Sequence, residues 1–317
     1  MEPEFSRSPE LPVLVIGAAG VDIIGRVRGE LQARTSSPAN IRISFGGVAR
    51  NLAENLARLG QPVNLISVVG QDEAGAQMLE STRLAGVNVD GVLRSEDFPT
   101  GTYLGVVNNE GEMQYALDDM RAISCLTPEY LHSLERWFDQ ASMVFLDANL
   151  PKETIRRVMS IARRKQLPVV ADPTSQALAE KLRRYIPRLL MVVPNYREAE
   201  ILCDRHISPT SRREALAAAK CLVAQGVEIA IIGLAAFGVC YATSQTSGHV
   251  PALRTAVVDP TGAGDALTAT VLFGLLNDIP IDDAVRLGVT AASLTLRHRG
   301  SVVPNLSLEN LYDQLVM

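Results

Sequence analysis

The sequence predicts an α/β protein: a mainly parallel central sheet covered by helices on both sides, with a small β-sheet lid, all within one domain over residues 1–317. Two observations carry this prediction. Short runs of valine, isoleucine and leucine recur with helical patterns between them, an alternation typical of parallel sheets. Hydrophobic residues make up 47% of the 317 residues while aromatic residues make up only 5%, a composition that suits strands buried on both faces.

Six apolar segments bounded by Gly, Pro or Asp are predicted to form the buried strands. They are residues 12–17, 63–70, 143–147, 168–172, 189–194 and 229–233. A helix is predicted just before the second of these segments. There, Val48, Leu52, Leu56 and Leu59 recur at helical spacing and Gly60 follows them.

Two stretches, roughly residues 20–45 and 100–118, break the alternation and are predicted to form the lid. The second stretch contains two strand-like segments, 102–107 and 112–117, joined by the turn sequence Asn-Asn-Glu-Gly. The structural alternative is a pair of ordinary surface hairpins. A lid is favoured because each stretch adjoins a polar cluster, which in the first stretch contains Asp22.

Composition excludes several classes of function. The formal net charge of −5 gives no general attraction to nucleic acid or to an anionic membrane. No apolar run approaches the roughly 20 residues that span a bilayer, and the polar, acidic residues 1–9 do not resemble a signal peptide. The cysteines form no CxxC pair and have no histidine at metal-ligand spacing, so a reduced, cytoplasmic protein is expected.

The most informative segment is Asp-Pro-Thr-Gly-Ala-Gly-Asp at residues 259–265, followed by an apolar run. Its glycines and alanine would leave the N–H groups of a helix start open to an anion, above all phosphate. Asp265 would repel phosphate, so we expect it to take a proton from an attacking hydroxyl. The helix start should lower the pKa of Asp265 and keep it ionised. The structural alternative is a helix start whose dipole Asp265 merely balances.

A second element leads into the predicted helix that begins near Val48. Gly46 and Gly47 would let a ligand approach the backbone closely. The amide of Asn51 can both donate and accept hydrogen bonds, which suits a polyhydroxylated ligand such as a sugar. The structural alternative is that Asn51 caps the helix beside a tight turn.

A third element follows the strand predicted at 189–194. Asn195 is a natural N-cap, and Glu198 stands three residues later, as in a capping box. Glu198 could instead order water around a magnesium ion near a triphosphate. The pattern alone does not separate these two roles.

The three elements, in this order, resemble the ribokinase-like (PfkB) family of carbohydrate and nucleoside kinases, over the chain from Val13 to about Val303. The resemblance implies an ATP-dependent phosphotransferase that acts on an alcohol group. Within the family, residues 46–57 are similar to the signature of pseudouridine kinases. The expected acceptor is therefore the 5′-hydroxyl of a ribonucleoside, pseudouridine first. The alternatives are a ribokinase- or fructokinase-like sugar kinase and a non-catalytic ligand-binding homologue.

The resemblance also implies a role for each motif residue. Asp265 would be the catalytic base, and the anion hole would comprise the amides of Gly262, Ala263 and Gly264. The residues implied to bind the acceptor are Asp22, Gly46, Gly47, Arg50, Asn51 and Asn149. Those implied to serve ATP and Mg²⁺ are Asn195, Glu198, Gly233, Ala235 and Gly238, with Glu198 reaching the metal through water.

Two positions depart from the family pattern. Asp259 would lie near a loop that binds a monovalent cation such as K⁺, but Pro260 stands where threonine is usual, removing a backbone donor. Ala235 stands where the nucleotide loop usually has glycine. Cation dependence and phosphate-donor preference therefore stay open. The partners expected are the nucleoside and ATP, with a homodimer formed through the exposed strand edges of the lid.

Overall fold

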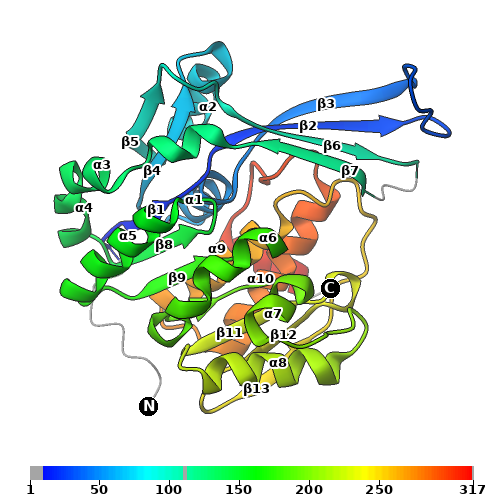
Figure 1. Ribbon diagram of the computed structural model, residues 1–317. Helices are drawn as coiled ribbons and strands as arrows, with labels where there is room; N and C mark the ends of the chain where they lie inside the picture. Colours follow the sequence, from blue (N-terminus) through cyan, green and yellow to red (C-terminus); the bar gives the residue numbers. More distant parts are fainter. Residues whose placement is uncertain (1–9, 110–112, 316–317) are drawn as a thin grey trace.

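The computed structural model describes residues 10–109 and 113–315 and contains two sheets (Figure 1). The larger has nine strands in the order β13-β12-β11-β10-β9-β8-β1-β4-β5. Its strands are β1 (Val13–Ile16), β4 (Val63–Gly70), β5 (Asn88–Ser95), β8 (Met143–Asp147), β9 (Val169–Asp172), β10 (Met191–Val192), β11 (Ile229–Gly233), β12 (Val239–Ala242) and β13 (Ser247–Val250). All neighbours pair in parallel except β11–β12 and β12–β13.

Helices cover both faces of this sheet. One face packs against α3 (Pro128–Ser133), α4 (Glu135–Asp139), α5 (Lys152–Arg164), α6 (Gln176–Ala179), α7 (Tyr196–Cys203) and α8 (Arg212–Ala224). The other packs against α1 (Val48–Arg58), α2 (Glu73–Leu84), α9 (Ala263–Leu276), α10 (Ile281–Arg297) and α11 (Leu308–Leu315). The predicted fold class is therefore confirmed.

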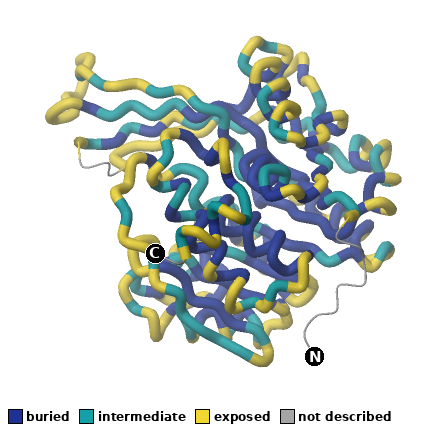
Figure 2. The backbone as a smooth tube through the Cα atoms, turned by 180° about the vertical axis from the view of Figure 1, so that it is seen from behind, coloured by how far each residue is buried: buried dark blue, intermediate teal, exposed yellow. Residues whose placement is uncertain are grey.

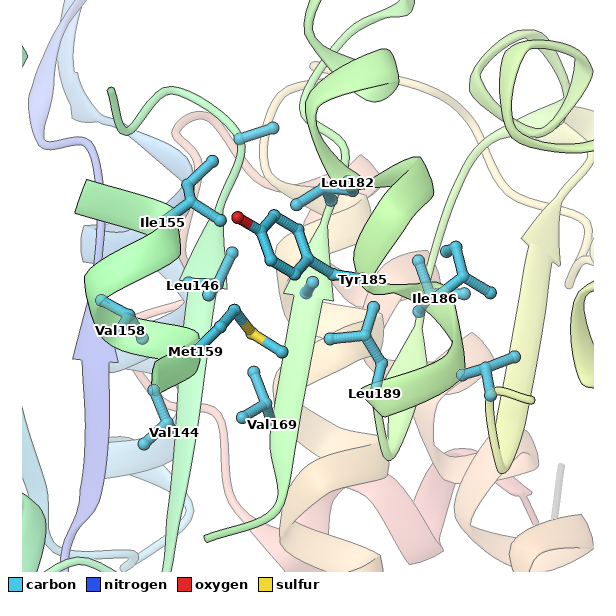
Figure 3. Close-up of a cluster of buried hydrophobic side chains, with 14 of the residues drawn as sticks. Val144, Leu146, Ile155, Val158, Met159, Val169, Leu182, Tyr185, Ile186 and Leu189 are labelled. Atoms are coloured by element: carbon cyan, nitrogen blue, oxygen red, sulfur yellow. The ribbon is translucent and has the colours of Figure 1, made fainter. Parts of the chain in front are cut away.

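Alternate residues of the central strands serve the two hydrophobic cores. In β1, Leu14 and Ile16 belong to the core under α5, while Val13 and Val15 belong to the core under α1. Figure 3 shows part of the first core, where side chains of α5 and β8 meet those of residues 180–189. Because such strands are apolar on both faces, they read as continuous hydrophobic runs, which is why all six predicted segments contain a strand.

The smaller sheet has the order β3-β2-β6-β7, with β2 (Gly20–Val27), β3 (Ala39–Gly46), β6 (Gly101–Val107) and β7 (Met113–Asp119). It projects from one end of the central sheet, and much of it is exposed or half-buried (Figures 1 and 2). Both stretches that break the alternation thus contribute its strands, within a residue or two of the expected limits. The predicted turn between β6 and β7 includes residues 110–112, which lie outside the described residues.

Register divides the small sheet into a polar and an apolar face. Ser44, Asp22, Tyr103 and Asp118 pair across the four strands and share one face. One residue along, Ile43, Ile23, Leu104 and Leu117 share the other. We call these the polar face and the apolar face. Among the helices that the structure describes, none combines the length and hydrophobicity needed to cross a membrane.

Candidate active site

The carboxyl ends of neighbouring parallel strands place acidic side chains along one edge of the central sheet. Asp147 ends β8 and Asp172 ends β9, in adjacent register. Asp147 is fully buried and accepts hydrogen bonds from the N–H of Ala18, at 2.8 Å, and of Asn149, at 2.9 Å. Asn149, an expected acceptor-binding residue, thus lies at this edge, directly after β8.

The glycine turn before α9 forms the predicted helix start. Gly262 is the N-cap with φ 79°, and a Cβ there would overlap the carbonyl oxygen of Ser301, so only glycine fits. A Cβ on Gly264, in contrast, would meet no heavy atom of the described residues within 4 Å. The space over the first turn of α9 is therefore open. Backbone N–H groups at a helix start that faces open space can bind an anion.

The carboxyl group of Asp265 faces α1 rather than capping its own helix. Asn51 Nδ2 donates to Asp265 Oδ2 at 2.7 Å, although 214 residues separate them in sequence. Neither α1 nor α9 has a side-chain cap among the described residues. The hydrogen bond between Asn51 and Asp265 is therefore not a helix cap. A role for Asp265 in balancing the helix dipole does not explain this bond either.

The expectation that the helix start lowers the pKa of Asp265 is wrong. Burial raises the pKa of Asp265 from 3.8 to about 7, and the nearby carboxylates of Asp22 and Asp147 raise it further, against the hydrogen bond from Asn51 and the charge of Arg50. Loss of hydration outweighs the helix dipole at a buried carboxylate. A carboxyl group with a pKa near neutrality is a stronger base than an exposed aspartate.

Asp22 projects from the polar face of the small sheet beside the two glycines. A Cβ on Gly46 would overlap the Asp22 carboxylate, and one on Gly47, whose φ is 92°, would overlap the carbonyl of Ala18. Burial raises the pKa of Asp22 to about 6, while the charge of Arg50 lowers it. Opposite Asp22, the buried hydroxyl oxygen of Ser44 has no hydrogen-bond partner among the described residues. Burial without a partner is unfavourable for a hydroxyl, and a hydrogen bond to a ligand or to water would relieve it.

Arg50, expected among the acceptor-binding residues, lies behind Asn51 and is 4% exposed. Its Nη1 donates to the carbonyl of Phe45 and to Asn51 Oδ1, both at 2.8 Å, and its Nη2 pairs with Glu54. Its guanidinium group is thus directed at protein atoms. The structure places Arg50 as a support for the site rather than on its surface.

Asn195 and Glu198 form the capping box at the start of α7: the Asn195 side chain accepts from the N–H of Glu198, whose side chain accepts from the N–H of Asn195. This capping role leaves a carboxylate oxygen lone pair free to order water. Burial raises the pKa of Glu198 to about 6, and burial together with the charges of Glu198 and Asp265 raises that of Asp172. Asp172 is therefore within electrostatic range of both Glu198 and Asp265.

No group of three or more His, Cys, Asp or Glu side chains in the described ranges forms a cage for a metal ion. Mg²⁺ retains most of its water and binds one or two carboxylates together with substrate phosphates. Glu198, in its acidic surroundings, fits that mode of binding and does not fit an all-protein site.

Of the residues expected to border the nucleotide, Gly233 ends β11, and Ala235 and Gly238 lie in the turn that follows it. Gly233 lies beside Asn195, to which it is bridged, so the turn after β11 and the start of α7 are neighbours. Ala235 has φ 50°, a left-handed conformation unusual for a residue with a Cβ, and Gly238 has φ 88°. A Cβ on Gly238 would overlap the carbonyl of Val250. The turn thus keeps a glycine-type backbone at Ala235 despite the alanine.

Asp259 lies at the junction of the small sheet and the loop before α9. Its carboxylate pairs with Arg42 of β3 and accepts from the N–H of Thr261, at 3.0 Å, and of Gly300, at 3.2 Å. A monovalent cation at this carboxylate would have to compete with Arg42, so the residues fit K⁺ poorly. A cavity of about 610 Å³ adjoins this ion pair and is lined on the small-sheet side by Arg26 and Arg42.

Sequence reasoning missed Arg42 and Ser301. Ser301 Oγ lies 2.9 Å from Asn51 Oδ1 and 2.7 Å from the carbonyl of Phe45. The alternation of polar and apolar residues could have identified Arg42. It stands between Ile41 and Ile43 on a strand, so its side chain belongs to the face opposite theirs. No local pattern marks Ser301, which reaches the site only through the folding of the chain after α10.

Comparisons with known proteins agree with this geometry. The model of the pfkB family of carbohydrate kinases matches residues 11–307. The chain is 31% identical to a pseudouridine kinase of Escherichia coli (94% of this chain, 95% of that protein) and 30% identical to a guanosine-inosine kinase of Exiguobacterium acetylicum (93% and 97%). Its fold is similar to that of an Arabidopsis thaliana ribokinase complexed with ribose and ATP (TM-score 0.84, 21% identity, 98% and 100% coverage).

A match over nearly the whole chain, together with relatives at this level of identity, decides the family. The ribokinase-like architecture agrees with this assignment. The chain belongs to the PfkB family of carbohydrate kinases, which are phosphotransferases with an alcohol group as acceptor.

Proposed function

We propose that this kinase transfers the γ-phosphoryl group of ATP to the 5′-hydroxyl of a ribonucleoside, with pseudouridine as the first candidate. The observation that carries the proposal is the pairing of Asp265 with Asn51, 2.7 Å apart, beside the open first turn of α9. A base and an array of N–H donors thus meet at one point, as phosphoryl transfer to an alcohol needs.

In this mechanism the acceptor hydroxyl donates its proton to Asp265 as its oxygen bonds to the γ-phosphorus and the bond to the ADP oxygen breaks. The N–H groups of Ala263 and Gly264 stabilise negative charge on the transferring group. Asn195 positions Glu198, which would hold Mg²⁺ through water; the metal, when bound, neutralises phosphate charge. Gly233, Ala235 and Gly238 would border the nucleotide.

Asp22 and Asn51 would hold the ribose hydroxyls, and the buried hydroxyl of Ser44, which has no partner in the described part of the chain, would bind a further polar group. Tyr103 pairs in register with Asp22 on the polar face, where an aromatic ring suits contact with a nucleobase. Of three relatives at 30–33% identity, two are nucleoside kinases by name and the third, from Escherichia coli, is named an uncharacterized sugar kinase. These observations favour a nucleoside over a free sugar.

The small sheet would act as a lid over the acceptor. Its polar face carries Asp22 toward the site, and the Arg42–Asp259 ion pair fastens it to the loop before α9. Closure of such a lid excludes water, which otherwise competes with the acceptor for phosphate. Cytoplasmic location and any effect of K⁺ stay predictions.

We also propose that the lid mediates a homodimer through its apolar face. Ile43, Leu104 and Leu117 share one row of that face and are 66%, 38% and 68% exposed. Large apolar side chains gathered on one surface mark an interaction site. A second copy of the chain offers the same flat apolar surface, as a two-fold interface requires.

A panel of acceptors tests the function. ADP release, coupled to an indicator reaction, is measured with uridine, pseudouridine, cytidine, adenosine, ribose and fructose. The proposal predicts the highest kcat/KM for a nucleoside, with pseudouridine first. Preference for ribose or fructose would show a sugar kinase instead, and thermal stabilisation by a nucleoside without any ADP release would show a non-catalytic binding protein.

A further inference from the structure

Both ends of the Asn51 side-chain amide, its oxygen and its nitrogen, contact polar groups. On its oxygen side, Arg50 Nη1 donates at 2.8 Å and Ser301 Oγ lies at 2.9 Å. On its nitrogen side, Nδ2 donates to Asp265 at 2.7 Å. A continuous path of polar contacts therefore runs from a buried guanidinium group, through one amide, to the proposed base.

The order of this path fixes which end of the amide meets Asp265. An asparagine side chain has an acceptor oxygen at one end and a donor nitrogen at the other. In the reversed orientation, the oxygen of Asn51 would face the carboxylate of Asp265 and its NH₂ group would face the donors of Arg50. Both contacts would then be repulsive, so Arg50 selects the orientation in which Asn51 donates to Asp265, whereas the hydroxyl of Ser301, which can donate or accept, fits either orientation.

Arg50 is itself held rigidly. Its side chain is buried, pairs with Glu54 one helical turn later, and contacts Thr82 Oγ1 at 3.4 Å. Arg58 holds the second oxygen of Glu54 and also donates to the carbonyl of Pro304. An arginine with this support presents its fork in one direction, unlike an exposed side chain that samples many rotamers.

The positive charge of Arg50 also affects the ionisation of Asp265. Three carboxylates interact electrostatically with Asp265: the charges of Asp22 on β2 and Asp147 on β8 raise its pKa, and its own charge raises the pKa of Asp172 on β9. Arg50 of α1 is the cation that opposes them at this position. Without it, the proton on Asp265 would be held more tightly.

We propose that Arg50 is a positioning residue that orients the Asn51 amide and favours the ionised form of Asp265. The inference rests on the proposed function, in which Asp265 is the base. In this view Arg50 acts on the protonation state of Asp265, whereas the sequence motif alone suggests that Arg50 contacts the acceptor.

The test is the pH dependence of kcat/KM for the wild type and for Arg50→Gln and Arg50→Lys. Arg50→Gln should move the acidic limb up by about one pH unit, a roughly tenfold loss at pH 6.5, with most of the activity regained at pH 9. Arg50→Lys, which keeps the charge, should shift less. The control is Arg83→Gln, which removes an exposed ion pair with Glu80 on α2 and should leave the profile in place.

A folded Arg50→Gln protein with lowered activity but an unmoved acidic limb would overturn the inference, since a merely structural role lowers the rate at every pH. If Arg50→Gln fails to fold, Arg50→Lys decides in the same way: an upward shift of the limb supports the inference and an unshifted limb overturns it. Failure of the proposed function shows differently, as a wild type without ADP release or an Asp265→Asn variant with full turnover.

Discussion

At Asp265, opposing effects set the pKa of one carboxyl group. Burial and neighbouring carboxylates raise it to about 7, while the hydrogen bond from Asn51 and the charge of Arg50 lower it. A base is most effective when its pKa lies near the working pH, because it is then both ionised and basic. The environment of Asp265 thus adjusts an ordinary aspartate to neutral-pH chemistry.

The pH dependence of activity follows from this pKa. Because only ionised Asp265 accepts a proton, kcat/KM should be constant well above pH 7 and fall about tenfold per pH unit below it. The fall should steepen below pH 6, where Asp22, with a pKa raised to about 6, also becomes protonated. A pH–rate profile from pH 5 to 9 measures this, and a profile that stays flat down to pH 5 would contradict it.

Substitution of Gly264 should change the stability and the activity of the protein in opposite directions. Replacing it by alanine adds a methyl group that meets no described atom and should stabilise α9 by about 0.5–1 kcal/mol, because alanine favours the helix. The same methyl group enters the space assigned to the phosphoryl group, so kcat/KM should fall about a hundredfold.

Thermal unfolding and steady-state kinetics of Gly264→Ala check both effects together. Gly274→Ala in the same helix is the matched control. Its Cβ would lie 2.8 Å from that of Ala284, so this variant should lose stability instead. Full activity of Gly264→Ala would show that the phosphoryl group lies elsewhere.

Among the elements, β3 connects the lid both to α1 and to the loop before α9. Gly46 at its end leads to α1 and Asn51, while Arg42 in its middle pairs with Asp259 in the loop before α9. Position along one strand therefore decides whether a residue touches the acceptor site or fastens the lid. Its outward residues, such as Ile43, contribute to neither.

Arg42→Gln should loosen the lid. Arg42 is 29% exposed but Asp259 only 3%, so losing Arg42 leaves a buried carboxylate unpaired, at a cost of about 3 kcal/mol. KM for the acceptor should therefore rise by at least about fivefold, and amide exchange in β3 should accelerate. Arg28→Gln, which removes only a lid contact with Asn40, is the control and should change neither. Unchanged KM and exchange in Arg42→Gln would mean that the ion pair does not hold the lid closed.

At the scale of the whole molecule, the apolar face of the lid should control assembly. Ile43→Asp places a charge at the middle of that face and should convert a dimer to a monomer in light scattering. Leu84→Asp alters a residue of α2 that is 79% exposed but distant in sequence from the lid, and should leave the mass unchanged. A wild type that is monomeric at all concentrations would refute the proposed dimer.

Much of the fold could be predicted because its causes are local. Buried parallel strands such as 143–147 are continuous apolar runs, and the capping box of Asn195 and Glu198 needs only three residues of spacing. The partners of Asp265 could not be predicted, because Asn51 and Arg50 lie more than 200 residues away in sequence. Its pKa was predicted in the wrong direction for the same reason: the helix start is visible in the motif, whereas burial arises only when α1, α9 and the strands pack together.

The most direct test of the account is the turnover of Asp265→Asn with its best acceptor. Asparagine keeps the shape and the contact with Asn51 but cannot take a proton, so kcat should fall by about 10²–10⁴-fold, while nucleoside and ATP still stabilise the protein against heat. The variant should also melt no lower than the wild type at pH 8, because it no longer buries a charge whose pKa folding raises. Near-normal kcat in this folded variant would contradict the assignment of Asp265 as the base.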